Sequence, residues 1–374
     1  MCDVPALRFP EFSDEWEKCL ISDFGMVITG NTPPTKDVDN YKDGIKLWAS
    51  PIDLGKSKWI YDTQTKLSVT GFEKTRKLPQ GAILVTCIGS TIGKMGMATC
   101  EIATNQQINS IITNSDNDKD FVYYAIESKF PKYLTSVAIQ AVPIISKSSF
   151  ERLPNIRTTL TEQKKIGRFL SLIDKRIETQ NKIIEDLKKL KSAIRKKMFS
   201  LLKDEYTESF EINQLLDYEQ PTAYIVANDE YSTDTSLTPV LTANKGFILG
   251  YTDEKFGIYQ KGECIIFDDF TMDAKYVSFP FKVKSSAIKI LTAKPNVNLR
   301  FMFEYLSYWE LKSEGHKRHY ISEIASLVIE LPSKERQSII ASLMTSLNSK
   351  LDIEAKTKIR YEEQKRYLLS QMFI

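Results

Sequence analysis

A helical pattern of 27 residues occurs twice in this chain, and it limits the possible folds more than any single motif does. The first copy covers residues 173–199 and the second, 174 residues further on, covers residues 347–373. Without a gap, Lys191 falls on Lys365, Met198 on Met372 and Phe199 on Phe373. A solenoid repeats every few dozen residues, so a repeat with this separation indicates two similar halves instead.

Apolar residues in both copies recur at alternating spacings of four and three, which is the 3.5-residue period of a coiled coil. The apolar seam positions that we expect to face a partner helix are Ile173, Ile177, Ile184, Leu187, Ile194, Leu347, Leu351, Tyr361 and Leu368. Polar residues interrupt both seams at the same two steps, where Gln180 matches Glu354 and Lys191 matches Lys365. Polar seam residues weaken a coil but fix its register and its partner.

Each repeat belongs to a predicted helix of about 35–40 residues, which is longer than most helices of globular proteins. A helix with a narrow apolar stripe must bury that stripe against another helix, and the other copy is the simplest partner. We therefore predict that the two helices pair in antiparallel orientation. Two separate surface helices, each packed on its own domain, are the alternative.

Composition sets outer bounds on the fold. The 374 residues are sufficient for two domains of ordinary size, and 42% hydrophobic with 26% charged residues is a globular composition. No apolar run approaches the roughly 20 residues of a membrane helix. The five cysteines are scattered and odd in number, and only two histidines are present, which predicts a reducing cytoplasm and no metal site.

The chain alternates between globular and helical segments. We predict an α+β fold with a first globular domain at residues 1–155, a central helix at 156–203, a second globular domain at 204–332 and a distal helix at 333–374. Short apolar runs broken by turn residues indicate strands in both domains. Residues 161–203 contain 13 Lys or Arg against 5 Asp or Glu, an excess that favours contact with nucleic acid or an acidic protein, although a solvated helix face explains it equally well.

Several motifs, in this order, resemble the specificity subunit of a type I restriction-modification system. VPALRFPEF (residues 4–12) resembles the N-terminal lead, and ITGNTPPT (28–35) an early element of a target recognition domain. LPQGAILVTCIGSTIGKMGMA (78–98), ATNQQINSI (103–111) and LTEQKKIGRFLSLID (160–174) resemble the core signature and the start of the conserved helix. In the second half, residues 238–254 and 266–291 resemble one recurrent domain subtype. Thr159 and Arg336 depart from the usual linker pattern, in place of a proline and a glutamate.

The resemblance implies two target recognition domains, separated by two long antiparallel coiled-coil helices with pseudo-two-fold symmetry. Each domain would read one half of a bipartite site in double-stranded DNA, and the coil would set the gap and dock two methylation subunits. The chain itself would hold no cofactor. S-adenosylmethionine would belong to the methylation subunits, and ATP with Mg²⁺ to motor-nuclease subunits that join the complex. No membrane association is implied.

Three segments resemble catalytic motifs, and we interpret all three as structural. The segment from Asn31 to Pro34 resembles an amino-methyltransferase loop, but Thr32 interrupts it and no aromatic residue follows. Residues 89–94 lack the spacing of a phosphate-binding loop. The pair Asp268 and Asp269 has no nearby motif that would complete a metal-nuclease site, so we expect it to form a turn or to contact a base amino group.

Sequence-specific reading of DNA needs donors and acceptors directed at base edges, together with cations on phosphates. In the first domain the candidate contacts are Ser90, Thr91, Lys94, Asn105, Gln106 and Gln107. In the second domain they are Lys245, Thr271, Lys275, Lys282, Lys284, Lys317 and Arg318. For each of these residues, a turn or an ordinary solvated surface position is an equally good interpretation.

Two other functions remain open at this point. A coiled-coil interaction scaffold that reads no DNA would explain the helices but not the recognition-domain motifs. An autonomous methyltransferase or nuclease would need an uninterrupted catalytic motif. Salt-dependent, sequence-specific DNA binding in the presence of methylation partners would distinguish a DNA-reading subunit from the interaction scaffold.

Overall fold

The computed structural model describes residues 4–137, 143–202, 207–242, 246–309 and 323–373. The chain forms two compact units. Unit 1 contains the chain up to Ile183 together with everything from Ala355 onward, and unit 2 contains the segment from Ile184 to Glu354. Among the described residues, no helix is both long and apolar enough to cross a membrane.

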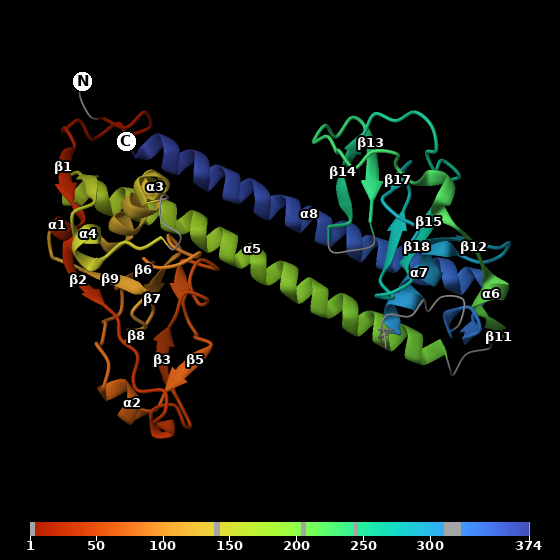
Figure 1. Ribbon diagram of the computed structural model, residues 1–374, viewed down its shortest axis with the longest axis horizontal. Helices are drawn as coiled ribbons and strands as arrows, with labels where there is room; N and C mark the ends of the chain where they lie inside the picture. Colours follow the sequence, from red (N-terminus) through yellow and green to blue (C-terminus); the bar gives the residue numbers. More distant parts are fainter. Residues whose placement is uncertain (1–3, 138–142, 203–206, 243–245, 310–322, 374) are drawn as a thin grey trace. The chain divides into compact units, whose positions relative to one another are not determined.

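Two long helices, α5 (Leu160–Leu201) and α8 (Lys334–Met372), each run from one unit into the other (Figure 1). They contain 42 and 39 residues, close to the predicted length. In unit 1 the beginning of α5 packs against the end of α8, because Leu170 and Ile173 share a core with Leu368 and Met372. In unit 2 the end of α5 packs against the beginning of α8, where Phe199 and Ile340 share a core. The predicted antiparallel pairing of the two helices is therefore confirmed within each unit.

The globular part of unit 1 is built on a five-stranded sheet. Its strand order is β2 (Gly25–Thr29), β9 (Ile108–Thr113), β6 (Ile83–Thr86), β7 (Met95–Ala98) and β4 (Trp59–Ile60). All neighbours pair antiparallel except β4, which is parallel to β7. All four residues of β6 are buried, which explains why this central strand reads as a continuous apolar run.

Smaller elements complete unit 1. A second sheet has the order β5 (Thr65–Leu67), β3 (Lys46–Ala49) and β8 (Ala103–Thr104). Helix α3 (Lys119–Val137) places Phe121 and Tyr124 in one core with the sheet and with the long helices. The remaining elements are β1 (Glu17–Leu20), which pairs with β10 (Pro154–Arg157), α1 (Ile21–Phe24), η1 (Val38–Asn40), α2 (Val69–Glu73) and α4 (Lys147–Glu151).

Unit 2 repeats this plan. Its main sheet has the order β12 (Leu216–Glu219), β18 (Ile288–Ala293), β15 (Cys264–Asp268) and β16 (Ala274–Val277), and all neighbours are antiparallel. A second sheet has the order β14 (Ile248–Thr252), β13 (Thr238–Leu241) and β17 (Lys282–Val283). The remaining elements are β11 (Glu208–Glu211), which pairs with β19 (Val328–Leu331), α6 (Ile212–Leu215), η3 (Pro221–Tyr224) and α7 (Leu299–Tyr308).

The two units correspond element by element. Central strand β6 of unit 1 matches β15 of unit 2, because each is paired antiparallel on both sides, with β7 and β9 in one case and with β16 and β18 in the other. Helices α3 and α7 follow the last strand of the sheet in the same way. Two repeated α+β domains joined to two long helices are the fold class that the sequence predicts.

Candidate nucleic-acid interface

One edge of the main sheet in unit 1 gathers three loops that are far apart in the sequence. Strand β2 ends at Thr29 opposite Asn109, and β6 ends at Thr86 opposite Ile108, so the loops after β2 and β6 meet the loop before β9. The Cys87 amide donates to the Gln107 carbonyl over 2.8 Å, which joins two of these loops. We call this surface loop edge 1; it consists of residues 30–34, 87–94 and 105–107.

Loop edge 1 contains all six candidate contacts of the first domain. Ser90, Lys94 and Gln106 are exposed, whereas Thr91 and Gln107 are half-buried. Asn105 has a different role, because it is buried and its carboxamide oxygen accepts from the Gln107 amide at 3.0 Å. Asn105 therefore shapes the turn, and the surrounding exposed side chains are those that a ligand can reach.

The glycines of the β6–β7 loop give it its conformation. Gly89 and Gly93 have φ angles of +93° and +91°, a region that L-residues with side chains rarely adopt. A Cβ atom on Gly93 would also lie 2.7 Å from the Phe130 ring. The glycines thus hold Ser90 and Thr91 at the tip of a tight, fixed loop.

Unit 2 has the equivalent edge, which we call loop edge 2; it consists of residues 269–273 and 284–287. The Asp269 amide donates to the Ala287 carbonyl over 3.1 Å, as Cys87 does to Gln107 in unit 1. The Asp268 carboxylate accepts from the backbone amides of Phe270 and Thr271, at 2.7 and 2.9 Å, so it forms the expected turn. Thr271 is exposed at the tip of that turn.

The other candidates of the second domain divide into three groups. Lys284 is exposed on loop edge 2, and Lys275 is half-buried on β16. Lys282 is fully buried, with its ammonium nitrogen 2.6 Å from Glu254 and 2.8 Å from the Phe256 carbonyl, which gives it a structural role and removes it from the candidate contacts. Lys245, Lys317 and Arg318 lie outside the described residues.

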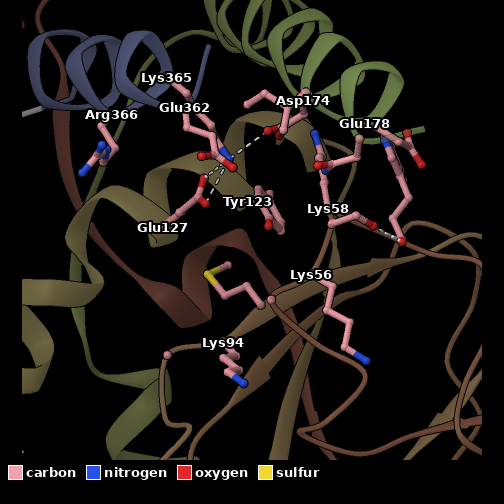
Figure 2. Close-up of a pocket in the computed structure, with 17 residues that line it drawn as sticks. Lys56, Lys58, Lys94, Tyr123, Glu127, Asp174, Glu178, Glu362, Lys365 and Arg366 are labelled. Carbon is pink, nitrogen blue, oxygen red and sulfur yellow. Dashed lines mark hydrogen bonds and ion pairs between the residues drawn. The ribbon is translucent and has the colours of Figure 1, made fainter. Parts of the chain in front are cut away.

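A cleft of 570 Å³ lies in unit 1 between the domain and the long helices (Figure 2). Lys365 of α8 reaches into it and lies 3.0 Å from Glu127 of α3 and 2.9 Å from Asp174 of α5. Deeper in, Lys58 lies 2.6 Å from Asp120, and the Tyr124 hydroxyl donates to Asp174. These buried charges join one domain loop and three helices into a single network.

The titration behaviour of this network follows from burial and pairing. Burial raises the pKa of Glu127, although Lys365 opposes the shift. Burial lowers the pKa of Lys365, but the charges of Glu127 and Asp174 outweigh it, so that the net pKa of Lys365 is raised. Burial dominates at Lys58 and lowers its pKa. The charged groups at the centre of this network are thus already paired, and they connect the domain to the long helices.

Unit 2 uses the matching lysine in the same way. Lys191 of α5 lies 3.8 Å from Glu304 of α7, and Arg195 lies 2.7 Å from the same carboxylate, which is fully buried. The sequence marks Lys191 and Lys365 as polar seam residues but does not indicate their partners Glu304 and Glu127, because these two lie on the domain helices α7 and α3.

The predicted seam residues are among the less exposed residues of both helices. Ile173 and Leu368 are buried in unit 1. The half-buried seam residues are Ile177, Ile184, Leu187, Ile194, Leu347, Leu351 and Tyr361. Large apolar residues off the seam remain exposed, including Leu172 and Leu190 on α5 and Ile353 and Ile359 on α8.

Comparisons with known proteins agree with this two-domain architecture. The family model described as the type I restriction modification DNA specificity domain matches the chain twice, over residues 13–189 and 205–363. The EcoR124I/EcoR124II specificity subunit of Escherichia coli is 39% identical over 178 residues, which cover 42% of this chain and 43% of that protein. The HindI specificity subunit of Haemophilus influenzae is 29% identical over 186 residues, which cover 47% of this chain and 39% of that protein.

These alignments span about two-fifths of the length of each curated relative. A solved structure extends the likeness to the whole chain. The type I restriction-modification S subunit from M. genitalium superimposes with a TM-score of 0.69 at 17% identity and covers 99% of both chains, which is a similarity of fold. Because the family model covers nearly all of the sequence in two consecutive copies, this chain belongs to the type I restriction-modification DNA specificity family.

Proposed function

We propose that this chain is the DNA-reading subunit of a type I restriction-modification complex and catalyses no reaction itself. The observation that carries the proposal is that the same loop edge occurs once in each unit, with exposed hydrogen-bonding side chains at equivalent places. Ser90 and Gln106 lie on one edge, and Thr271 and Lys284 on the other. Two such surfaces on one chain suit a bipartite target, of which the domains at residues 1–155 and 204–332 each read one half.

The side chains on the two edges have suitable chemistry. Glutamine and serine carry both donors and acceptors, which distinguish base pairs in the major groove, and lysine binds phosphate or guanine. Threonine adds a methyl group that can contact thymine. Each edge is held by backbone hydrogen bonds, so its side chains are presented without a large ordering cost on binding.

Partner subunits supply the chemistry in this proposal. Methylation subunits would bring S-adenosylmethionine, and motor-nuclease subunits would bring ATP and Mg²⁺. The long helices carry exposed apolar side chains that suit protein docking, such as Leu190 on α5 and Ile359 on α8. Because the two units repeat one plan, two identical methylation subunits would find equivalent surfaces. The continuous helices α5 and α8 would set the gap between the half-sites.

Exchange of one domain tests this function. Residues 204–332 would be replaced by the second recognition domain of another family member, and adenine methylation would be mapped in cells that also express the cognate methylation subunits. We expect one half of the methylated sequence to change while the other half and the gap stay the same. Simultaneous change in both halves contradicts independent reading, and absence of any sequence-specific methylation with the unmodified chain favours a scaffold that reads no DNA.

A further inference from the structure

The segment from Asn31 to Pro34, which resembles a methyltransferase loop in sequence, makes structural contacts in unit 1 together with the preceding Gly30. The Tyr41 hydroxyl donates to the Pro33 carbonyl at 2.8 Å, and the Asn40 amide group donates to the Pro34 carbonyl at 2.9 Å. A Cβ atom on Gly30 would lie 2.2 Å from the Thr104 carbonyl oxygen. This segment therefore forms a rigid support within loop edge 1.

Asn31 fastens a distant segment to this support. Its side-chain nitrogen donates to the Lys74 carbonyl at 2.9 Å, and its side-chain oxygen accepts from the Arg76 amide at 2.8 Å. Both polar atoms of the carboxamide are thus engaged, as they would not be in a group that holds a target amine. The consequence is that Arg76, 45 residues further along the chain, is anchored next to loop edge 1.

The Arg76 guanidinium is held in a defined orientation. Its Nη1 atom donates to the Thr29 carbonyl at 2.7 Å, and the side chain is nevertheless exposed. Among the described residues, its Nε–Nη2 edge has no hydrogen-bond partner. An arginine that presents two parallel donors matches the O6 and N7 acceptors of guanine.

Thr32 orients a second side chain. Its hydroxyl donates to the Gln106 side-chain oxygen at 2.5 Å, and Gln106 is exposed. The carboxamide nitrogen of Gln106 has no hydrogen-bond partner among the described residues, so its two hydrogens are available to a ligand. Residues 29–32 thus hold two exposed donor groups, one on Arg76 and one on Gln106.

We propose that Arg76 and Gln106 are specificity-determining residues of the first domain, that Arg76 reads guanine, and that Asn31 and Thr32 are the positioning residues that aim them. This inference rests on the proposed function and deepens it. It also gives a role to a segment whose sequence resembles a catalytic loop but whose polar side chains, Asn31 and Thr32, make structural hydrogen bonds.

The experiment maps methylation with the full chain and its methylation subunits, comparing unmodified protein with Arg76→Lys and Arg76→Ala. The matched control is Lys77→Ala, since Lys77 is the next residue and pairs with Glu73. We expect both Arg76 variants to lose discrimination at one base pair of the first half-site by between about fivefold and 150-fold, the range of one bidentate contact. The second half-site and the thermal unfolding midpoint should not change.

A second arm tests the positioning residues. Thr32→Val keeps the side-chain shape and removes the donor, with Thr35→Val as the control. We expect Thr32→Val to relax a different base pair from the one that Arg76 affects. An unchanged recognition sequence for the Arg76 variants, or weaker methylation that is uniform across all sequences, overturns the inference while leaving the proposed function in place. Loss of sequence-specific methylation already in the unmodified protein overturns both.

Discussion

Gln163 and Gln337 occupy equivalent places near the starts of the two long helices and make the same pair of hydrogen bonds. Gln163 accepts from the Asp118 amide at 2.9 Å and donates to the Thr158 carbonyl at 2.7 Å. Gln337 accepts from the Asn298 amide at 2.8 Å and donates to the Pro332 carbonyl at 2.9 Å. Both glutamines are about 1% exposed. Each one therefore joins the beginning of a long helix to the beginning of the domain helix that follows the main sheet, α3 in unit 1 and α7 in unit 2.

Removal of either glutamine should destabilise its unit. Gln163→Ala leaves the Asp118 amide without its acceptor in a buried place, which costs about 1–3 kcal/mol. Gln337→Ala should have a similar cost through the Asn298 amide. Urea unfolding measures both, with the exposed Gln64→Ala as control. A change of less than about 0.5 kcal/mol, the usual range for surface substitutions, would show that these hydrogen bonds do not stabilise the junction.

Lys365 should be necessary for the buried network of unit 1. Lys365→Met leaves Glu127 and Asp174 without their shared cation, and loss of one partner of a buried pair costs about 3–5 kcal/mol. The exposed Lys356→Met on the same helix is the control. Denaturant unfolding at pH 7 gives the difference in the free energy of unfolding, and equal values for the two variants would contradict a stabilising role.

The same variant should show a distinctive pH dependence. The folded pKa of Glu127 is already raised by burial, and removal of Lys365 takes away the main opposing charge. A carboxyl whose folded pKa is raised contributes stability that is present below its unfolded pKa and is lost as the pH rises through the folded pKa. The difference in the free energy of unfolding between Lys365→Met and the unmodified protein should therefore become smaller as the pH falls from 7 toward 5. A difference that is constant over this range would show that Glu127 does not take up a proton.

The sequence predicts those features of this arrangement that arise from local spacing of residues, and it does not predict those that arise from packing between distant segments. The heptad spacing predicts both long helices and their pairing, because a 3.5-residue stripe can be buried only along another helix. The same pattern identifies Lys191 and Lys365 as exceptions but not Glu304 and Glu127 as their partners, since those partners are set by how α7 and α3 pack. Tertiary packing of this kind leaves no periodic signal.

The candidate interface shows the same limit. Loop signals in the sequence indicate Ser90 and Gln106, because Ser90 follows one strongly apolar strand and Gln106 precedes another. The sequence does not indicate Arg76, because its position depends on a hydrogen bond to the Asn31 side chain, 45 residues earlier in the chain. Lys282 shows the converse. In the sequence its charge indicates a surface contact, whereas in the structure the side chain is buried beside Glu254.

The ion pair between Lys282 and Glu254 should make a contribution to the stability of unit 2 that is lost in acid. The hydrogen bond from Lys282 holds the pKa of Glu254 below its ordinary value of 4.5. A depressed carboxyl pKa contributes stability that is present above the unfolded value and is lost as the pH falls through the folded value. Lys282→Met should be about 3 kcal/mol less stable at pH 7 and should lose less further stability than the unmodified protein below pH 4.5. Urea unfolding at several pH values checks this, with the exposed Lys255→Met as control.

A fragment ending at Lys203 should self-associate through α5. Without α8 it lacks Leu368, Met372 and Phe373, so Ile166, Leu170 and Ile173 lose their covering. Burial of each large aliphatic side chain is worth roughly 1.5–3 kcal/mol, and the same stripe on a second copy is the nearest equivalent partner. An antiparallel pair about a two-fold axis would then form, weakened by the polar positions Gln180 and Lys191. With methylation subunits present, such a dimer should methylate a palindrome made of two copies of the first half-site.

Sedimentation velocity at fragment concentrations between about 1 and 50 µM tests this association. We choose this concentration range because we expect a dimer of moderate affinity. The control is the same fragment with Ile173→Asp, which places a charge on the exposed stripe and should hold the fragment as a monomer. A well-folded fragment that stays monomeric at tens of micromolar without that substitution would contradict the paired-helix account. A dimer whose methylation sites are not palindromic would show that the copies associate through a surface other than α5.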